Sequence, residues 1–390
     1  MRDLLMFVAL LGVLTSTVYL GLVLVATGRF RRRQRGAAPA RTIELLPAVT
    51  LLKPLHGMEP HLRDNVESFF RQEYPAYEIV FGMRNQDDPA FSVVREVSSR
   101  YPQVRVKTVF SGEPVWPNAK VYNLDRMLQA ASHDVLVISD SDVRVETNYL
   151  RDVTRPLLDP EVGLVTCLYR GVHTGGLWSR LEALGMSVEM TSGVLVADML
   201  EGMKFALGPT MATRRDALQA AGGMAELADY LADDFVLGRR IEAAGYKVVL
   251  SNHVIDHVVV NRSLRSSLQH QFRWAKSTRL SRPKGHVGSG LTFAVPFALL
   301  GLAMALWGGH PWMAAAIFLA GILNRSLQCL AVGWGVVRDP AALQTFWLYP
   351  LRDLLGFLFW AASFFGGKHT TWRGNRYRLQ PGGRMVREAA

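Results

Sequence analysis

The sequence predicts an α/β fold, with a mostly parallel sheet and helices on both faces, together with transmembrane helices. Two observations lead to this prediction. From Pro47 to about Asn261, strand-like runs alternate with helix-like stretches, which is typical of parallel sheets covered by helices. Long apolar segments lie outside that region, and hydrophobic residues make up 49% of the 390-residue chain. This blend is typical of a folded domain joined to membrane segments.

The alternation can be followed element by element. It begins with a strand over residues 48–55 and a helix over 60–72, which Pro60 opens because proline suits the first turn of a helix. Val135 to Ile138 form an unbroken apolar run, as expected for a central strand buried on both faces. Between them the sequence predicts strands over 77–83 and 104–110 and helices over 89–101 and 118–131.

The first apolar segment, Leu4 to Ala26, is long enough to cross a bilayer, which takes about 20 residues. The arginines of residues 29–35 follow it, whereas a signal peptide carries its positive charge before a shorter apolar core. The positive-inside rule then places the N-terminus outside and the chain after Arg29 in the cytoplasm. We therefore expect a membrane anchor rather than a cleaved signal.

The C-terminal part changes in character. Residues 262–285 mix apolar and basic side chains and favour an amphipathic helix in the membrane interface. Three apolar stretches follow, near residues 291–309, 312–336 and 344–366. The third contains Pro350, Arg352 and Asp353, and charged side chains are costly in hydrocarbon. We expect it to be broken or re-entrant, which leaves the basic tail in the cytoplasm.

The predicted organisation has five parts. They are an N-terminal transmembrane anchor (1–28), a cytoplasmic α/β domain (45–261), an interfacial helix (262–285), a C-terminal transmembrane or re-entrant region (288–367) and a basic cytoplasmic tail (368–390). The formal net charge of +11 is concentrated beside the apolar segments, which favours an anionic membrane surface over nucleic acid as the partner. Cys167 and Cys329 lie in apolar surroundings, and we expect both to be inert core residues.

Two carboxylates follow the predicted central strand. Asp140 and Asp142 form a D-x-D motif where the strand ends, and ligands of such sheets bind beyond the carboxyl ends of the strands. Mg²⁺ and Mn²⁺ prefer carboxylate oxygens and often bridge them to substrate phosphates. The alternative is a turn in which the side chains accept local backbone hydrogen bonds. The position of the D-x-D motif at the end of a buried strand favours a metal and diphosphate site over such a turn.

Two further groups of residues are candidates. Asp233 and Asp234 precede a predicted helix, where one aspartate can cap the helix and the other can act as a general base towards an acceptor hydroxyl. Asp233 is the candidate for the helix cap or for a second carboxylate at the site. In "HQFRW" (270–274), Arg273 can bind a diphosphate and Trp274 can stack, although both also suit the headgroup level of a membrane. Lys120 is either a further positive charge near the phosphates or a solvated helix residue.

These three elements, in this order, resemble the membrane-bound glycosyltransferases of the GT-A fold. The resemblance is strongest to the ceramide glucosyltransferase family, family 21 of the glycosyltransferases, and it covers about residues 45–285 plus the tail. The segments that carry it are "LLKPLHGMEPHLRDNVESFFRQEYPAYEIVFGMRNQDDPA", "WPNAKVYNL", "VGLVTCLYRG", "RRDALQAAGG", "LADYLADDF" and "WRGNRYRLQPGG".

The resemblance implies a role for each matching residue. Asp140 takes the place of the family's second aspartate, at a metal–diphosphate site that Asp142 completes, with Mn²⁺ or Mg²⁺ as the cofactor. Asp234 matches the third aspartate, the catalytic base. Arg273 and Trp274 match the Arg-Trp pair that holds the leaving nucleoside diphosphate.

The chain departs from the family pattern at two positions. The family's first aspartate, which contacts the nucleotide base, falls on Asn85. Asparagine can still pair with uracil, and Asp87 or Asp88 are alternative contacts. His270 stands where the family has Gln or Arg. Both departures concern nucleotide contacts rather than the type of reaction.

The resemblance implies transfer of a hexosyl group from a UDP-sugar to a hydroxyl of a membrane lipid, with inversion at the anomeric carbon. UDP-glucose and ceramide are the favoured pair. The chain's compact loops and Arg- and Ala-rich composition favour a bacterial inner-membrane protein, so N-acetylglucosaminyl transfer to a hopanoid polyol is an alternative. Alternatives of another class are a polysaccharide synthase, which would need more spans to form a channel, and a non-catalytic membrane scaffold.

Overall fold

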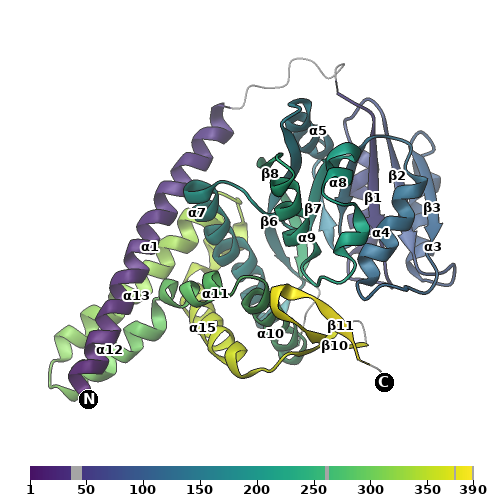
Figure 1. Ribbon diagram of the computed structural model, residues 1–390. Coiled ribbons are helices and arrows are strands. Elements are labelled where there is room, and N and C mark those ends of the chain that lie inside the picture. Colours follow the sequence, from purple (N-terminus) through teal and green to yellow (C-terminus); the bar gives the residue numbers. More distant parts are fainter. Residues whose placement is uncertain (37–45, 260–262, 373–374, 389–390) are drawn as a thin grey trace.

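The computed structural model describes residues 1–36, 46–259, 263–372 and 375–388. The predicted boundaries at residues 45 and 261–262 lie outside this part of the chain. Figure 1 shows a sheet covered by helices and, beside it, a long helical arm that contains the N-terminus. The C-terminal strands return to the lower edge of the sheet domain (Figure 1).

The first half of the sheet follows the predicted alternation closely. The strands are β1 (Val49–Pro54), β2 (Tyr77–Met83), β3 (Arg105–Phe110) and β4 (Val135–Ser139), and the helices between them are α2 (Leu62–Ser68), α3 (Ala90–Arg100) and α4 (Ala119–Ala130). These four strands pair in parallel, in the order β3-β2-β1-β4. Their carboxyl ends therefore lie at one edge of the sheet. All five residues of β4 are buried, as the apolar run predicts.

The second half makes the sheet mixed. Its strands are β5 (Val143–Arg144), β6 (Val162–His173), β7 (Thr210–Arg214) and β8 (Lys247–Val259), and its helices are α5 (Tyr149–Thr154), α8 (Arg215–Ala220) and α9 (Asp233–Ala243). β7 is antiparallel to both β4 and β6, β8 is parallel to β6, and β5 is antiparallel to β8. The predicted α/β fold is confirmed, with β7 reversing the strand direction beside the D-x-D motif.

The remaining helices of the chain lie along one side of the sheet domain (Figure 1). This helical part consists of α1 (Arg2–Gly36), α6 (Gly176–Leu184), the π-helical turn η4 (Gly185–Met190), α7 (Thr191–Glu201), α10 (Leu264–Ser281), α11 (Pro283–Ser289), α12 (Val295–Trp307), α13 (Pro311–Gln328), the π-helical turn η7 (Cys329–Trp334), α14 (Pro340–Thr345) and α15 (Tyr349–Phe365). The tail forms an antiparallel sheet of β9 (His369–Trp372), β10 (Asn375–Leu379) and β11 (Met385–Arg387).

Within the described residues, three helices are long and apolar enough to cross a membrane: Arg2–Gly36, Gly176–Glu201 and Pro311–Trp334. A helix pair, Pro283–Thr292 and Val295–Trp307, bent by 47°, adds a fourth candidate. More than half of the apolar window in Gly176–Glu201 is buried within the protein (61%), so other parts of the chain cover most of this helix.

The stretch 344–366 is interrupted near its start, where α14 ends at Thr345 and a 3-10 turn, η8 (Phe346–Leu348), follows. The remainder, α15, is one continuous helix from Tyr349 to Phe365, and a re-entrant course of this stretch stays a prediction. Its charged residues do not face hydrocarbon. Asp353 is buried, accepts the N–H groups of Ala294 and Val295 at the start of α12, and pairs with Arg325 of α13 at 3.3 Å. The Asp353 carboxylate thus caps α12 and is neutralised by Arg325 of α13. The free-energy cost of exposing this charge to hydrocarbon, which led us to expect a break, therefore does not arise.

Candidate active site

The D-x-D motif lies at the edge where the parallel strands end, and a buried lysine supports it. Lys53, at the end of β1, donates from Nζ to the backbone carbonyl of Asp140 at 2.5 Å, and its ammonium lies 3.8 Å from the centre of the Phe69 ring. Burial lowers the pKa of Lys53 to about 7, although the nearby carboxylates of Asp142 and Asp140 oppose this shift. Lys53 therefore fixes the turn that presents both aspartates.

Lys120 joins two carboxylates that belong to different motifs. Its Nζ lies 2.7 Å from Oδ1 of Asp140 and 3.7 Å from Oδ2 of Asp233. Asn118 caps α4 by accepting the Lys120 and Val121 N–H groups, which sets the direction of the lysine. Burial lowers the pKa of Lys120, but the two carboxylates outweigh it and hold the pKa above its usual value. The solvated alternative is excluded, because the side chain is only 14% exposed.

Asp142 contacts a histidine that sequence reasoning missed. Nε2 of His257 lies 3.3 Å from Oδ2 of Asp142, and β5 pairs with β8 so that Val143 stands opposite His257. The other carboxylate oxygen of Asp142 is buried and has no hydrogen-bond partner among the described residues. No local signal marks His257, since only this long-range pairing brings it to the motif.

A divalent cation fits these residues. Asp140 and Asp142 offer hard oxygen ligands, and the unpartnered buried oxygen of Asp142 is a donor atom that a cation would satisfy. Within the described ranges, no group of three or more His, Cys, Asp or Glu side chains is arranged so that it could hold a metal ion. Two carboxylates suffice for Mg²⁺, which usually keeps several waters and binds substrate phosphates.

Asp234 is held by backbone amides in the first turn of α9. Its Oδ2 accepts the N–H of Gly208 at 2.6 Å, and its Oδ1 accepts the N–H of Phe235 at 2.7 Å. Burial, followed by the negative charge of Asp233, raises the pKa of Asp234 to about 6. A carboxylate with a pKa near the working pH suits a general base.

Asp233 is not the helix cap that one interpretation assigned to it. Ala232 occupies the N-cap position, and Asp233 is the first residue of α9. Its buried carboxylate lies beside Lys120 instead. Burial raises the pKa of Asp233, while the positive charge of Lys120 opposes the rise. The structure therefore supports the other interpretation, in which Asp233 is a second carboxylate at the site.

Helix α10 carries His270, Arg273 and Trp274. Nδ1 of His270 lies 2.7 Å from the buried carboxylate of Glu182 on α6, and its ring lies 4.6 Å from the Trp274 ring. The hydroxyl of Ser267 donates to the same carboxylate at 2.6 Å. His270 thus fastens α10 to α6.

The loop after β2 contains the predicted contacts to the nucleotide base. Asn85 and Asp87 are exposed there. Asp88 is engaged in the fold, because its carboxylate accepts the N–H groups of Gly57 at 3.0 Å and of Ala90 at 2.9 Å. Of the candidates that the sequence left open, Asn85 and Asp87 are the two whose side chains face solvent.

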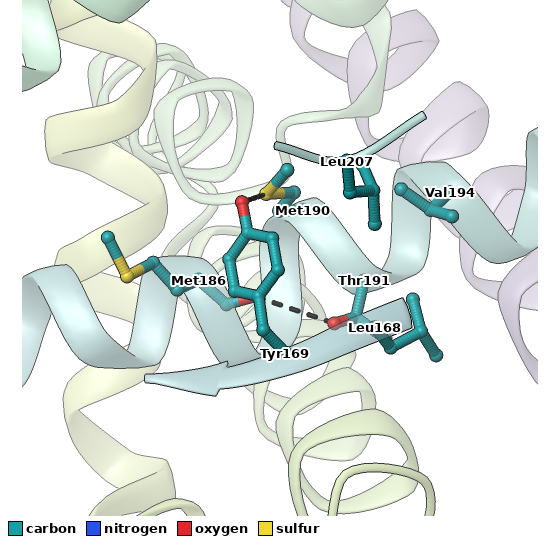
Figure 2. Close-up of a pocket in the computed structure, with 7 residues that line it drawn as sticks. All are labelled: Leu168, Tyr169, Met186, Met190, Thr191, Val194 and Leu207. Carbon is teal, nitrogen blue, oxygen red and sulfur yellow. Dashed lines mark hydrogen bonds between the residues drawn. The ribbon is translucent and has the colours of Figure 1, made fainter. Parts of the chain in front are cut away.

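A small, mostly apolar cavity lies between β6 and the helix formed by η4 and α7. It is too narrow to admit a water molecule and is lined by Leu168, Tyr169, Met186, Met190, Thr191, Val194 and Leu207. Figure 2 shows the Tyr169 ring rising from β6, with its hydroxyl at the sulfur of Met190. Leu207 directly precedes Gly208, whose N–H binds Asp234, so the cavity adjoins the candidate base.

Comparison with known proteins shows the family. The model of "Glycosyl transferase family 21" matches residues 4–385. The chain belongs to this family. It is therefore a glycosyltransferase, and the match runs through the candidate membrane helices as well as the sheet domain.

Relatives and a solved structure agree with this assignment. The chain is 26% identical over 352 residues to ceramide glucosyltransferase 1 of Caenorhabditis elegans, covering 87% of this chain and 73% of the relative. It is 28% identical to ceramide glucosyltransferase 3 of the same organism, covering 59% of this chain and 50% of the relative. The mannosyltransferase PcManGT of Pyrobaculum calidifontis, solved with GDP-Man and Mn²⁺, has a TM-score of 0.55 and 19% identity, covering 90% of this chain and 98% of that chain. This likeness shows a common fold.

Proposed function

We propose that this family 21 glycosyltransferase transfers a hexosyl group from a UDP-sugar to the hydroxyl of a membrane lipid, with UDP-glucose and ceramide as the favoured pair. The observation that carries the proposal is the arrangement of Asp234. Two backbone amides fix its carboxylate, and the Lys120–Asp140 pair lies within reach of its neighbour Asp233. The proposed base and the proposed diphosphate site are thus connected through Asp233 and Lys120.

Asp234 would remove the proton of the acceptor hydroxyl as the oxygen attacks the anomeric carbon. The amides of Gly208 and Phe235 hold its two oxygens in place, so the carboxylate need not reorganise during the reaction. A single base carboxylate fits a single displacement with inversion.

Positive charge would stabilise the departing UDP. Lys120 and Arg273 are the residues of the chain that would supply it, and preorganised charge of this kind is often the largest contribution to catalysis. A divalent cation, Mn²⁺ or Mg²⁺, held by Asp140 and Asp142 would add Lewis-acid stabilisation of the diphosphate. The relative solved with GDP-Man and Mn²⁺ has the same fold, which supports this assignment. Asn85 and Asp87 would contact the uracil base.

The membrane part suits a lipid acceptor. The helical arm keeps the chain at the bilayer, where the acceptor remains, and the α6–α7 helix connects this arm to the sheet domain. The names of the relatives, ceramide glucosyltransferases, support ceramide.

An assay of donor and acceptor pairs tests the proposal. The full chain, purified in detergent with Mn²⁺ or Mg²⁺, is offered UDP-glucose or UDP-N-acetylglucosamine, each with ceramide or a hopanoid polyol. UDP release and the mass of the lipid product are followed, with Asp234→Asn as the matched control. Glucosylceramide is the expected product. An N-acetylglucosaminyl hopanoid would overturn the choice of substrates, a growing polysaccharide would overturn the lipid acceptor, and UDP binding without any turnover would favour a scaffold.

A further inference from the structure

We propose that the C-terminal sheet, formed by β9, β10 and β11, is a positioning element of the active site. It pairs with the loop Ala228–Ala232, which leads into Asp233 and Asp234, and ties that loop to α10, the helix of Arg273 and Trp274. Figure 1 shows β10 and β11 beside α10, below the sheet domain. This inference rests on the proposed function, because Asp234 acts as the base there.

Backbone hydrogen bonds join the tail to the loop. The N–H of Leu231 donates to the carbonyl of Gly383 at 3.3 Å, and the N–H of Met385 donates to the carbonyl of Asp229 at 2.6 Å. Tyr230 and Arg384 form an isolated antiparallel bridge between these bonds, and Nε of Arg384 donates to the Tyr230 hydroxyl at 3.1 Å. The tail thus adds a strand to the loop only two residues before the carboxylates.

The same tail is fastened to α10. Nζ of Lys276 donates to the carbonyl of His369 at 2.8 Å, and Arg279 donates to the carbonyl of Gly367 at 3.0 Å. Three buried tail residues form a small core with Leu231 of the loop and Leu280 of α10; they are Tyr377, Leu379 and Met385. One apolar cluster therefore contains residues from the loop, from α10 and from the tail.

Gly383 sets how closely the tail approaches α10. Its φ is +83°, a conformation that strains other residues, and a Cβ there would stand 2.4 Å from Oγ of Ser281. Gly382 has a similar φ of +81°, but a Cβ there would meet nothing within 4 Å. Alanine at Gly382 would therefore add backbone strain alone, whereas alanine at Gly383 would add similar strain and also displace the tail from α10.

The other side of the loop contacts α4. Nδ2 of Asn118 donates to the carbonyl of Tyr230 at 2.7 Å, and its backbone N–H donates to the carbonyl of Ala228 at 2.8 Å. Asn118 also caps α4 and thereby directs Lys120. The loop is held between this cap and the tail. Loss of the tail contacts leaves the loop before Asp234 supported from one side only. A displacement of about 1 Å at a catalytic group can cost roughly 100-fold in rate.

The test compares Gly383→Ala with Gly382→Ala in the full-length chain. We expect Gly383→Ala to lower kcat at least about 10-fold, with the KM for the UDP-sugar and UDP affinity within about 2-fold, and to speed hydrogen exchange of residues 229–235. Gly382→Ala should resemble the wild type in both measurements. Equal kcat and equal exchange in the two variants would overturn the proposal, as would a general loss of UDP affinity, which indicates a role in overall folding.

A disulfide supplies a second, reversible test. Tyr230 and Arg384 face each other between hydrogen bonds, where Cα atoms lie about 4.5 Å apart, within the range of a disulfide. The two native cysteines are buried. We expect the triple variant Gly383→Ala/Tyr230→Cys/Arg384→Cys to regain kcat when the disulfide forms on oxidation and to lose it again on reduction. A kcat that does not respond to oxidation or reduction would contradict the proposal. If the wild type transfers no sugar, the proposed function fails, and hydrogen exchange still tests the tail contact.

Discussion

Replacement of Asp234 by Asn separates base catalysis from binding. The substitution keeps the shape of the side chain but removes its ability to accept the acceptor proton. General-base catalysis contributes about 10²- to 10⁴-fold in rate, which corresponds to about 3–5 kcal/mol of activation free energy. We therefore expect kcat to fall by that factor while UDP binding, which depends on other residues, stays within about 2-fold.

The surroundings of Asp234 also set the cost to stability. Its two oxygens accept N–H groups from Gly208 at 2.6 Å and Phe235 at 2.7 Å. In the Asn variant one of these amides faces an NH₂ group and loses its acceptor, which costs about 1–3 kcal/mol of unfolding free energy. That loss lowers the melting temperature but is small beside the rate effect, so a folded variant that binds UDP remains available for the assay.

The pH dependence gives an independent check of the same residue. Burial and the charge of Asp233 raise the pKa of Asp234 to about 6, above its usual value of about 4. A raised pKa keeps the carboxyl protonated, and inactive as a base, up to about pH 6, so kcat should rise with pH through that value and then level off. Transfer is measured by UDP release between pH 4.5 and 8.5. An Asn variant with full kcat, or with the wild-type pH profile, would refute the assignment.

Three further substitutions test other parts of the structure. Lys120→Met removes an ammonium that competes with a metal ion for the neighbouring carboxylate, so calorimetry should show tighter Mn²⁺ binding while kcat falls; weaker binding would contradict this. Gly208→Ala places a Cβ 2.9 Å from Oδ2 of Asp234 and should lower kcat roughly 10- to 100-fold at unchanged UDP affinity. Asp353→Ala leaves the buried Arg325 unpaired and should cost about 3–5 kcal/mol, visible as a lower melting temperature in detergent than that of an Arg325→Met/Asp353→Leu double variant.

The first half of the fold was predictable because each element has a strong local signal. The apolar run of β4 and the amphipathic stretches of α3 and α4 were placed to within a few residues. β7 and its antiparallel direction were not predicted, because both depend on where the chain returns after α6 and α7. A five-residue strand carries no sign of that return in its own sequence.

The candidate site shows the same division. Its motifs led to Asp140, Asp142 and Asp234, because these residues stand at the end of an apolar strand or at the start of a helix that the sequence itself predicts. Their partners carry no such local signal: His257 reaches Asp142 through the pairing of β5 with β8, and Gly208 reaches Asp234 across 26 positions of sequence. Residue types that could do the chemistry were thus visible in the sequence, whereas the contacts that tune them come from tertiary structure.

The membrane helices illustrate a limit of composition. Asp353 looked costly in hydrocarbon because a hydropathy argument places every side chain of an apolar stretch against lipid. The structure buries it among helices, with Arg325 as counter-ion and two N–H donors at the start of α12. Burial between helices and exposure to lipid leave similar patterns in sequence, and only the packing distinguishes them.

The side of the membrane on which the catalytic domain lies can be argued from one end of α1. The basic residues 29–35 end this helix, and Arg33 pairs with Asp198 of α7 at 2.9 Å, while Gln34 donates to the carbonyl of Asn252 on β8 at 3.0 Å. The basic end of α1 and the catalytic domain are therefore on the same side of the apolar segment. Because basic flanks of membrane segments remain in the cytoplasm as a rule, this contact agrees with the cytoplasmic placement expected from the sequence, where a UDP-sugar would reach Asp140 while the lipid stays in the bilayer.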